Sequence, residues 1–343
     1  MWHSCIKYPR ITVQPEQPAR GIQDFRRSFL NYWRQLPNKA FFLLLLIAWL
    51  ALFQFFGNTT LGYIRSQSPS LFVWLLNAYD PEGKYARSDD GHGVIIPFIV
   101  LGLFWWKRKE LLAVPIRIWA PGVLFVGFGL VLHILGYMGQ QPKLSVIALF
   151  IGLYGLMGLA WGPAWLHASF FPFFLFAFCV PLGTQALFIT FPLRVLVCRL
   201  VTLIANGFLA IDVERVGTAL INTSGHYQYE VAAACSGMRS LIASLALSMI
   251  YAFMVFPTWW KRGVLIAAAF PLAVFGNVVR MLTIIIAAEM GGQSWGNAVH
   301  EGGPLGVFSL IPYIPAFAGL LLLGHYLRER QPESVLTLQP EVA

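Results

Sequence analysis

Charged side chains are scarce in this 343-residue chain: only 11% of the residues are Asp, Glu, Lys or Arg, whereas 57% are hydrophobic. So few polar groups cannot cover the surface of a soluble domain. The hydrophobic residues are gathered in runs long enough to cross a bilayer. The composition therefore excludes an ordinary soluble protein and predicts one that crosses the membrane several times.

Cysteines are also few. The four of them, Cys5, Cys179, Cys198 and Cys235, show no paired spacing and no C-x-x-C motif. A disulfide framework and a structural zinc site are therefore not expected, and neither a metal nor another cofactor is predicted. Three of the cysteines lie in apolar runs or in the polar N-terminal tail. Only Cys235 lies at the border between a polar segment and a long apolar run.

Positive charges outnumber negative ones by nine. These cations form clusters between apolar runs, which is the pattern that fixes the orientation of a membrane protein. A duplex-binding protein instead gathers its cations on one face or along one helix. Nucleic acid is therefore not an expected partner, and the lipid bilayer is.

The apolar runs predict an all-α polytopic membrane protein with about eight transmembrane helices and both termini in the cytoplasm. The expected spans are residues 40–56, 94–106, 118–137, 144–161, 167–184, 234–256, 263–290 and 305–327. The apolar stretch 191–211 contains two arginines and is interpreted as an interfacial or re-entrant helix. Residues 1–39 would form a basic cytoplasmic tail, 40–327 the membrane-embedded domain, and 328–343 a second cytoplasmic tail.

Three intervals are expected on the outer face besides the tight turn at 139–143. Residues 57–93 contain a short apolar patch and are predicted to form a loop with an interfacial helix. Residues 212–229 alternate apolar and polar side chains around a Thr-Ser-Gly turn, which predicts a small hairpin-like cap over about 212–232. The glycine-rich interval 291–304 is predicted to be an outer loop.

A candidate nucleophile begins the sixth predicted span. Cys235 and Arg239 are four residues apart, so on a helix they share one face. A neighbouring cation favours the thiolate, which is the nucleophilic form of cysteine. The alternative is that Cys235 is a small core residue and Arg239 an interfacial anchor.

The seventh predicted span contains an arginine where a charge is unfavourable. An arginine at the centre of a span costs about 2.5 to 3.5 kcal/mol, so Arg280 needs a partner or a function. Asn277 precedes it by three residues and shares its helix face. His300 follows in the predicted outer loop, on the same side as Cys235. In the alternative reading, Arg280 binds a structural carbonyl or Glu289, and His300 is a solvated loop residue.

The sequence resembles the exosortase/archaeosortase proteins, which are polytopic membrane enzymes. The resemblance rests on Ala-Cys-Ser-Gly-Met-Arg-Ser-Leu around Cys235, on Asn-Val-Val-Arg ending at Arg280, and on His300 followed by two glycines and Phe308. It covers roughly residues 91–308, including the His-Gly pair at His92. Met238 stands where the family pattern has leucine, and a long basic N-terminal tail and the lack of a fused C-terminal soluble domain are further departures.

The resemblance implies a cysteine peptidase and transpeptidase in the bacterial inner membrane, with its active site at the outer face. Cys235 would form a thioester with the substrate, His300 would act as acid and base, and Arg280 would stabilise the oxyanion. Arg239 and Asn277 would support them. Glu230 and His92 are candidates for substrate binding.

The implied partners are exported proteins whose C-terminus contains a short Pro-Glu-Pro-like (PEP-CTERM) motif, one transmembrane helix and a basic end. The acceptor in the cell envelope is not specified by the sequence. Two readings from other classes remain. A transporter or channel would use Arg280, Arg239 and Arg194 to line a path for an anion, and a scaffold would leave the cost of Arg280 unexplained.

Overall fold

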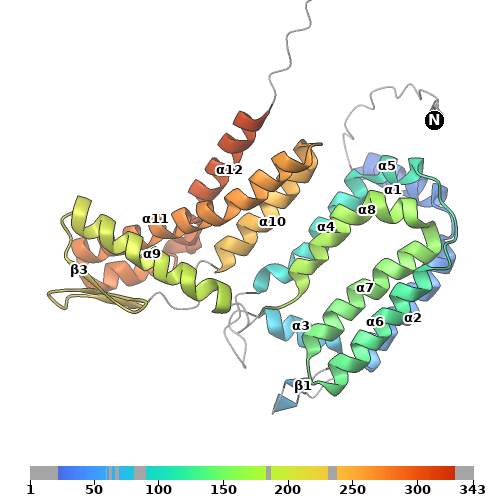
Figure 1. Ribbon diagram of the computed structural model, residues 1–343, viewed down its shortest axis with the longest axis horizontal. Helices are drawn as coiled ribbons and strands as arrows, with labels where there is room; N and C mark the ends of the chain where they lie inside the picture. Colours follow the sequence, from blue (N-terminus) through green and yellow to red (C-terminus); the bar gives the residue numbers. More distant parts are fainter. Residues whose placement is uncertain are drawn as a thin grey trace, which may run out of the picture.

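The computed structural model describes residues 22–58, 60–61, 64–65, 69–80, 90–182, 187–230 and 238–328. Helices dominate this part of the chain (Figure 1). They are α1 (Ile22–Gln35), α2 (Lys39–Phe55), α3 (Leu71–Tyr79), α4 (Ile96–Trp106), α5 (Arg108–Ala113), α6 (Gly122–Met138), α7 (Pro142–Trp161), α8 (Pro163–Phe174), α9 (Leu187–Phe208), α10 (Met238–Val255), α11 (Trp259–His300) and α12 (Tyr313–Leu327).

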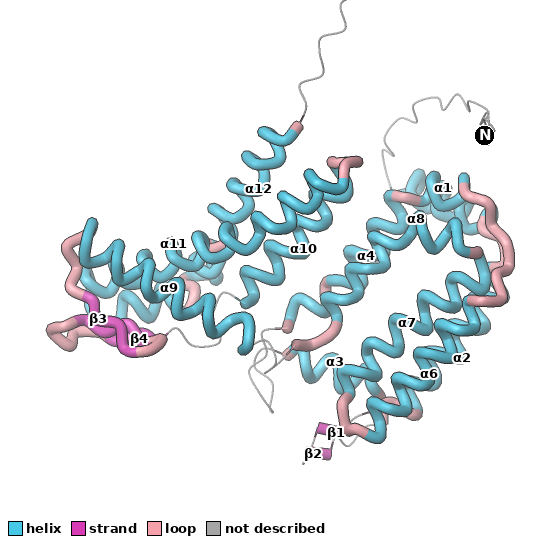
Figure 2. Tube along the Cα trace, in the orientation of Figure 1, coloured by secondary structure: helices cyan, strands magenta, loops and turns pink. Residues whose placement is uncertain are grey.

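Short elements connect the helices (Figure 2). The 3-10 segments are η1 (Gly91–Val94), η2 (Leu175–Cys179) and η5 (Pro304–Leu310). The strands are β1 (Thr60–Leu61), β2 (Ile64–Arg65), β3 (Val213–Val216), β4 (Ala219–Asn222) and β5 (Gln228–Glu230). The first two strands form a small hairpin, and the last three form an antiparallel sheet in the order β3-β4-β5.

Each of the eight predicted spans overlaps a helix, from α2 for residues 40–56 to α12 for residues 305–327, but the α-helix within 167–184 ends at Phe174 and α12 begins only at Tyr313. In the described part of the chain, four helices are long and apolar enough to cross a membrane: α7, α11, the 191–208 part of α9, and 306–327, which contains α12. A fifth is added if the bent pair α1 and α2 is one span. The protein is therefore a multi-pass membrane protein, while eight crossings and cytoplasmic termini stay predictions.

The first half of the chain packs around α7. Helices α6 and α7 lie against each other along a row of glycines, where Gly129 approaches the backbone of Gly152. Trp49 of α2 lies against Gly152 and donates its indole N–H to the carbonyl of Leu149 (3.0 Å). His133 bonds Ser145 and the carbonyl of Phe56, both at 3.0 Å. Glycine thus permits close helix packing, and buried polar groups are paired.

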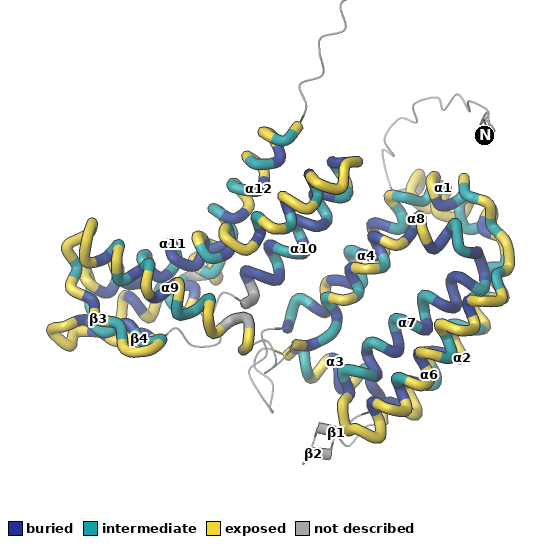
Figure 3. Tube along the Cα trace, viewed as in Figure 1, coloured by how far each residue is buried: buried dark blue, intermediate teal, exposed yellow. Residues whose placement is uncertain are grey.

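The second half is built on α11, which packs against α10 and α12 along its first part and against α9 along its later part. Side chains from α9, α11 and the three-stranded sheet share one buried core, which includes Val201, Leu220, Tyr229, Met281 and Ile285. Figure 3 shows buried positions along α11. The sheet lies inside the segment 212–232 that was predicted to be a cap. Its position on the outer face of the membrane stays a prediction.

The two halves meet through α10. Phe253 of α10 stacks on Phe171 of α8 with ring centroids 4.2 Å apart and an interplanar angle of 3°. Met249 of α10 joins the buried cluster formed by Ile96, Val100 and Leu175 in the first half. The helix that follows Cys235 in sequence therefore links the site-bearing half of the protein to the rest.

The predicted loop at 291–304 is partly wrong. Helix α11 continues to His300 after a break at Gly291 and Gly292, whose backbone angles are not helical. The pair interrupts the helix because Gly292 has φ 74°, a conformation that favours glycine. The eight residues after the break are helical again, since Gly296 packs against Tyr229 and Ala288. Only residues from Glu301 onward leave the helix.

Candidate active site

Arg280 contacts His300 directly. The Nη2 atom of Arg280 donates a hydrogen bond to the backbone oxygen of His300 over 3.1 Å. The Nε atom of Arg280 is buried and has no hydrogen-bond partner among the residues that the structure describes. A buried donor without a partner is unfavourable, so a further acceptor that reached Nε would be bound favourably.

The break in α11 is what brings these two residues together. In a straight helix, 20 residues would separate Arg280 from His300 by about 30 Å. The observed 3.1 Å contact requires the segment after Gly292 to turn back along the helix that precedes it. Gly296 lies against Ala288, as expected for such a return, and any side chain at position 296 would collide with Tyr229.

The ring of Tyr229 in β5 stacks on the ring of His300. The two rings stack with centroids 6.3 Å apart and an interplanar angle of 23°. Tyr229 is buried, and its hydroxyl donates to the carbonyl of Gln293 (3.2 Å). Burial raises the pKa of Tyr229, so the hydroxyl remains protonated at neutral pH and available as a donor.

Gln293 bonds the segment of α11 after the break, residues 293–300, to the sheet. Its Oε1 accepts from the backbone N–H of Gln228 (2.9 Å), and its Nε2 donates to the carbonyl of the same residue (3.3 Å). The amide side chain thus uses the free edge of β5 as a neighbouring strand would. The sheet, the returning helix and His300 are therefore held as one unit.

The start of α10 lies beside the same part of α11. Ser240 donates its hydroxyl to Oδ1 of Asn277 over 3.3 Å, and both residues are buried. Asn277 is one turn before Arg280 on the same helix face. Cys235 lies outside the described residues, five positions before Ser240, and Arg239 is described only as the second residue of α10. The contact places the helix that Cys235 precedes close to Arg280.

Comparison with known families adds to this geometry. Residues 85–323 match the transmembrane exosortase family (Exosortase_EpsH), and this range is well over half of the chain. The chain belongs to the transmembrane exosortase family. No curated protein and no solved structure matches it significantly. Family membership implies a membrane-bound sorting transpeptidase, and the matched range contains Cys235, Arg280 and His300.

The remaining candidates of this exosortase lie apart from the Arg280–His300 contact. Glu230 ends β5 and is exposed; because neighbouring side chains of a strand point to opposite faces, it points away from the face on which Tyr229 meets His300. His92 lies on η1, which packs against α3 and η2 in the first half of the chain.

Glu289 is not the partner of Arg280. It accepts hydrogen bonds from Tyr227 (3.1 Å) and from Asn222 (3.5 Å), which tie α11 to the sheet. Burial raises the pKa of Tyr227 to about 12, so this hydroxyl also stays protonated. Within the described ranges Arg280 forms no ion pair, and its partner is the carbonyl of His300. The Arg280 guanidinium thus bonds a backbone carbonyl, and the described contacts of Glu289 are to the sheet and not to Arg280.

Sequence reasoning missed Tyr229, Gln293 and Gly296. The alternating pattern predicted a hairpin-like cap that includes Tyr229, but nothing local connects this residue with a histidine 71 positions later. The two adjacent glycines at 291 and 292 were a usable signal, because such a pair marks a break inside a helix as readily as a loop. In the described residues, no group of three or more His, Cys, Asp or Glu side chains is placed to hold a metal.

Gly296→Ala is expected to destabilise the protein, because the added methyl group meets the Tyr229 hydroxyl and Ala288. Overpacking of this kind costs about 1 to 3 kcal/mol. Thermal unfolding of the detergent-solubilised protein measures the loss. Gly263→Ala is the matched control on the same helix, where a methyl group meets nothing within 4 Å. The control should be neutral or slightly stabilising, and equal melting temperatures for the two variants would contradict the close packing at Gly296.

Proposed function

We propose that this exosortase is a cysteine-dependent transpeptidase that cleaves C-terminal sorting signals of the PEP-CTERM type. The reaction would take place at the outer face of the bacterial inner membrane and transfer the exported protein to a cell-envelope acceptor. The observation that carries the proposal is the half-buried contact between Arg280 and His300, next to the start of the helix that Cys235 precedes.

In the first half-reaction, the Cys235 thiolate attacks the carbonyl carbon of the scissile peptide bond. Negative charge then develops on the carbonyl oxygen. Arg280 supports this step because its Nε lacks a partner among the described residues and is available to the oxyanion. His300 donates a proton to the leaving amide nitrogen, the C–N bond breaks, and a thioester with Cys235 remains.

In the second half-reaction, a nucleophile of the acceptor attacks the thioester. His300 removes the proton of this nucleophile, the C–S bond breaks, and the Cys235 thiolate is regenerated. The stacking of Tyr229 supports this role because it fixes the plane of the imidazole ring. Attack by water in place of the acceptor would give simple hydrolysis.

Substrate geometry agrees with an outer-face reaction. A tail with one transmembrane helix and a basic end keeps that end in the cytoplasm, so its short motif emerges on the opposite side. The predicted topology places Cys235, Arg280 and His300 on that side. Lipid surrounds the substrate helix, and the motif reaches the site at the membrane surface.

The direct test is to trap the acyl-enzyme. Purified enzyme is mixed with a synthetic sorting tail, quenched in acid and analysed by intact mass spectrometry. We expect a mass increase on Cys235 equal to the acyl fragment, and its release by hydroxylamine, which cleaves thioesters. Cleavage without any thiol-linked adduct would contradict the proposed mechanism. Full function after maleimide labelling of Cys235 would instead favour the transporter reading.

A further inference from the structure

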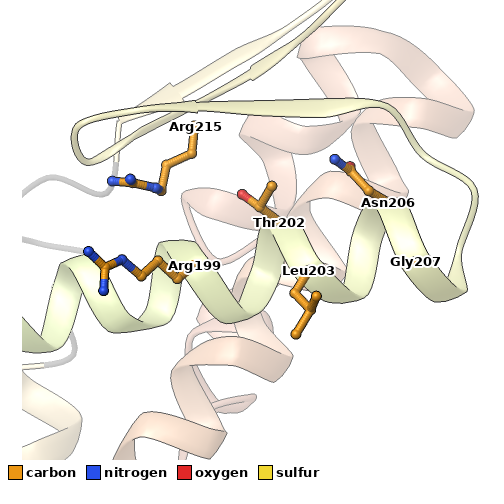
Figure 4. A pocket seen from close by; sticks show the side chains of 6 residues that line it. All are labelled: Arg199, Thr202, Leu203, Asn206, Gly207 and Arg215. Atoms are coloured by element: carbon orange, nitrogen blue, oxygen red, sulfur yellow. The ribbon is translucent and has the colours of Figure 1, made fainter.

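Two arginines line a groove between α9 and the sheet, away from the contact between Arg280 and His300. The groove is a cavity of about 520 Å³ that opens to the surface, and it is lined by Arg199, Thr202, Leu203, Asn206, Gly207 and Arg215. Figure 4 shows the guanidinium groups of Arg199 and Arg215 at the same end of the groove, one from the helix and one from β3. The groove is therefore strongly cationic at one end.

Arg215 occupies an inward-facing position of the sheet. It pairs in register with Leu220 of β4, which in turn pairs with Tyr229 of β5, so the three side chains lie on one face of the sheet. Leu220 and Tyr229 fill the core under the sheet, and Arg215 extends the same row over α9. An arginine in this row is turned toward the helix and toward Arg199.

Neither arginine has a counter-charge in the described part of the chain. The ion pair found there joins Lys107 and Glu110, in the other half of the protein. Arg215 donates one hydrogen bond to the carbonyl of Gly217 (2.8 Å), and no hydrogen bond is found for the Arg199 side chain among the described residues. Two like charges that face each other repel, and a bound anion converts that repulsion into attraction.

A third donor lines the same groove. The hydroxyl oxygen of Thr202 is buried and has no hydrogen-bond partner among the described residues, although a helical threonine commonly donates to the carbonyl one turn earlier. Figure 4 shows this hydroxyl on the side of the two guanidinium groups. Asn206 makes the wall rigid, because its amide bonds both the N–H (2.9 Å) and the carbonyl (3.1 Å) of Val213.

The donors specify the chemistry of the ligand. Two guanidinium groups and a hydroxyl, held by a fixed helix and strand, match an anion with several acceptor oxygens, and phosphate is the group that arginine binds best in this way. Beside the polar groups of the groove, α9 presents exposed leucines: Leu203, which lines the groove, is 64% exposed, and Leu196, two turns earlier on the same side of the helix, is 43% exposed. In a membrane protein, such a surface is suited to lipid chains.

We propose that Arg199, Arg215 and Thr202 bind the phosphate of an anionic phospholipid, with its acyl chains along the exposed apolar side of α9. This lipid fixes α9 and the sheet at the membrane surface. The lipid site is separate from the residues of the proposed transpeptidase reaction. A test of lipid binding is therefore independent of the proposed function.

The test measures binding of phosphatidylglycerol to the purified full-length protein in detergent by native mass spectrometry, with phosphatidylcholine as the zwitterionic reference. The double variant R199Q/R215Q is expected to lose at least tenfold in affinity for phosphatidylglycerol, with no change for phosphatidylcholine. R117Q is the matched control, because Arg117 is also exposed but lies in the other half of the chain. Unchanged binding in the double variant, or an equal loss in R117Q, would overturn the proposal.

Two further measurements keep the proposal testable if the double variant folds poorly. Thr202→Val removes the unpartnered hydroxyl at nearly constant volume, and we expect a loss of several-fold in phosphatidylglycerol affinity with an unchanged melting temperature. An unchanged affinity in this variant would overturn the role of Thr202. Displacement of the lipid by millimolar inorganic phosphate would assign the groove to a soluble anion, and displacement by a short acidic sorting peptide would assign it to substrate. Either displacement would overturn the lipid assignment.

Discussion

Replacement of Cys235 by alanine is expected to reduce cleavage of the cognate sorting tail by about 10⁴-fold or more, because the variant has no thiol to form the thioester. Cys235→Ser should also fail, since a serine hydroxyl is far less ionised than a thiol near neutral pH. Immunoblots of the tail in membranes with matched amounts of enzyme measure both losses.

Cys198→Ala is the matched control for a lost thiol. Cys198 is fully buried in the core of α9 and contacts the carbonyl of Thr218 through its sulfur at 3.6 Å, so its replacement removes a thiol without touching the proposed chemistry. Cleavage should persist in this variant. Full processing of the tail by Cys235→Ala would show that Cys235 is not the nucleophile. Equal losses of cleavage in Cys235→Ala and Cys198→Ala would show a general defect in folding.

Much of the helical framework could be predicted because its causes are local. Apolar runs of bilayer length, ended by aromatic and cationic residues such as Trp259 and Lys261, fix where helices form. The apolar stretch 191–211 was predicted to be an interfacial or re-entrant helix; it forms most of α9, whose residues 191–208 are long and apolar enough to cross a membrane. Length and composition alone do not decide whether such a helix crosses the bilayer.

The return of α11 could not be predicted from local signals alone. Two adjacent glycines are compatible with a loop or with a break between two helices, and the choice depends on what the following residues contact. Here Gly296 packs under Tyr229 and Gln293 pairs with the edge of β5. Both contacts join segments more than 60 residues apart, so they depend on the tertiary fold.

The candidate site shows the same division. The depth of Arg280 in an apolar helix predicted that it has a partner or a function. The helical spacing predicted that Asn277 lies on the same face as Arg280. The hydrogen bond of Arg280 to the backbone of His300 depends on the break at Gly292, and the orientation of the His300 ring depends on the cap. The sequence alone did not indicate what the cap does. In the structure it orients His300, the proposed acid and base.

Arg280→Ala is expected to lower the rate of cleavage by about 10² to 10³, the usual loss when one donor to a developing oxyanion is removed. The protein should still reach the membrane, because an apolar residue at this position makes insertion of α11 more favourable. Arg280→Lys should recover part of the activity, since it keeps the charge but cannot bind His300 and the oxyanion with a planar fork. Single-turnover cleavage of a synthetic tail separates this loss from weaker substrate binding.

Arg262→Ala is the matched control for this experiment. Arg262 lies on the same helix and also donates to a backbone carbonyl, that of Phe256 (2.7 Å), but it lies in the first turn of α11, well before Arg280. If loss of a guanidinium–carbonyl bond were enough to disturb the helix, both variants would lose activity equally. If Arg280 acts on the reacting carbonyl, only its variants lose the rate of the chemical step. Unchanged single-turnover cleavage in Arg280→Ala would mean that the oxyanion is stabilised by other groups and that Arg280 is a structural residue holding His300.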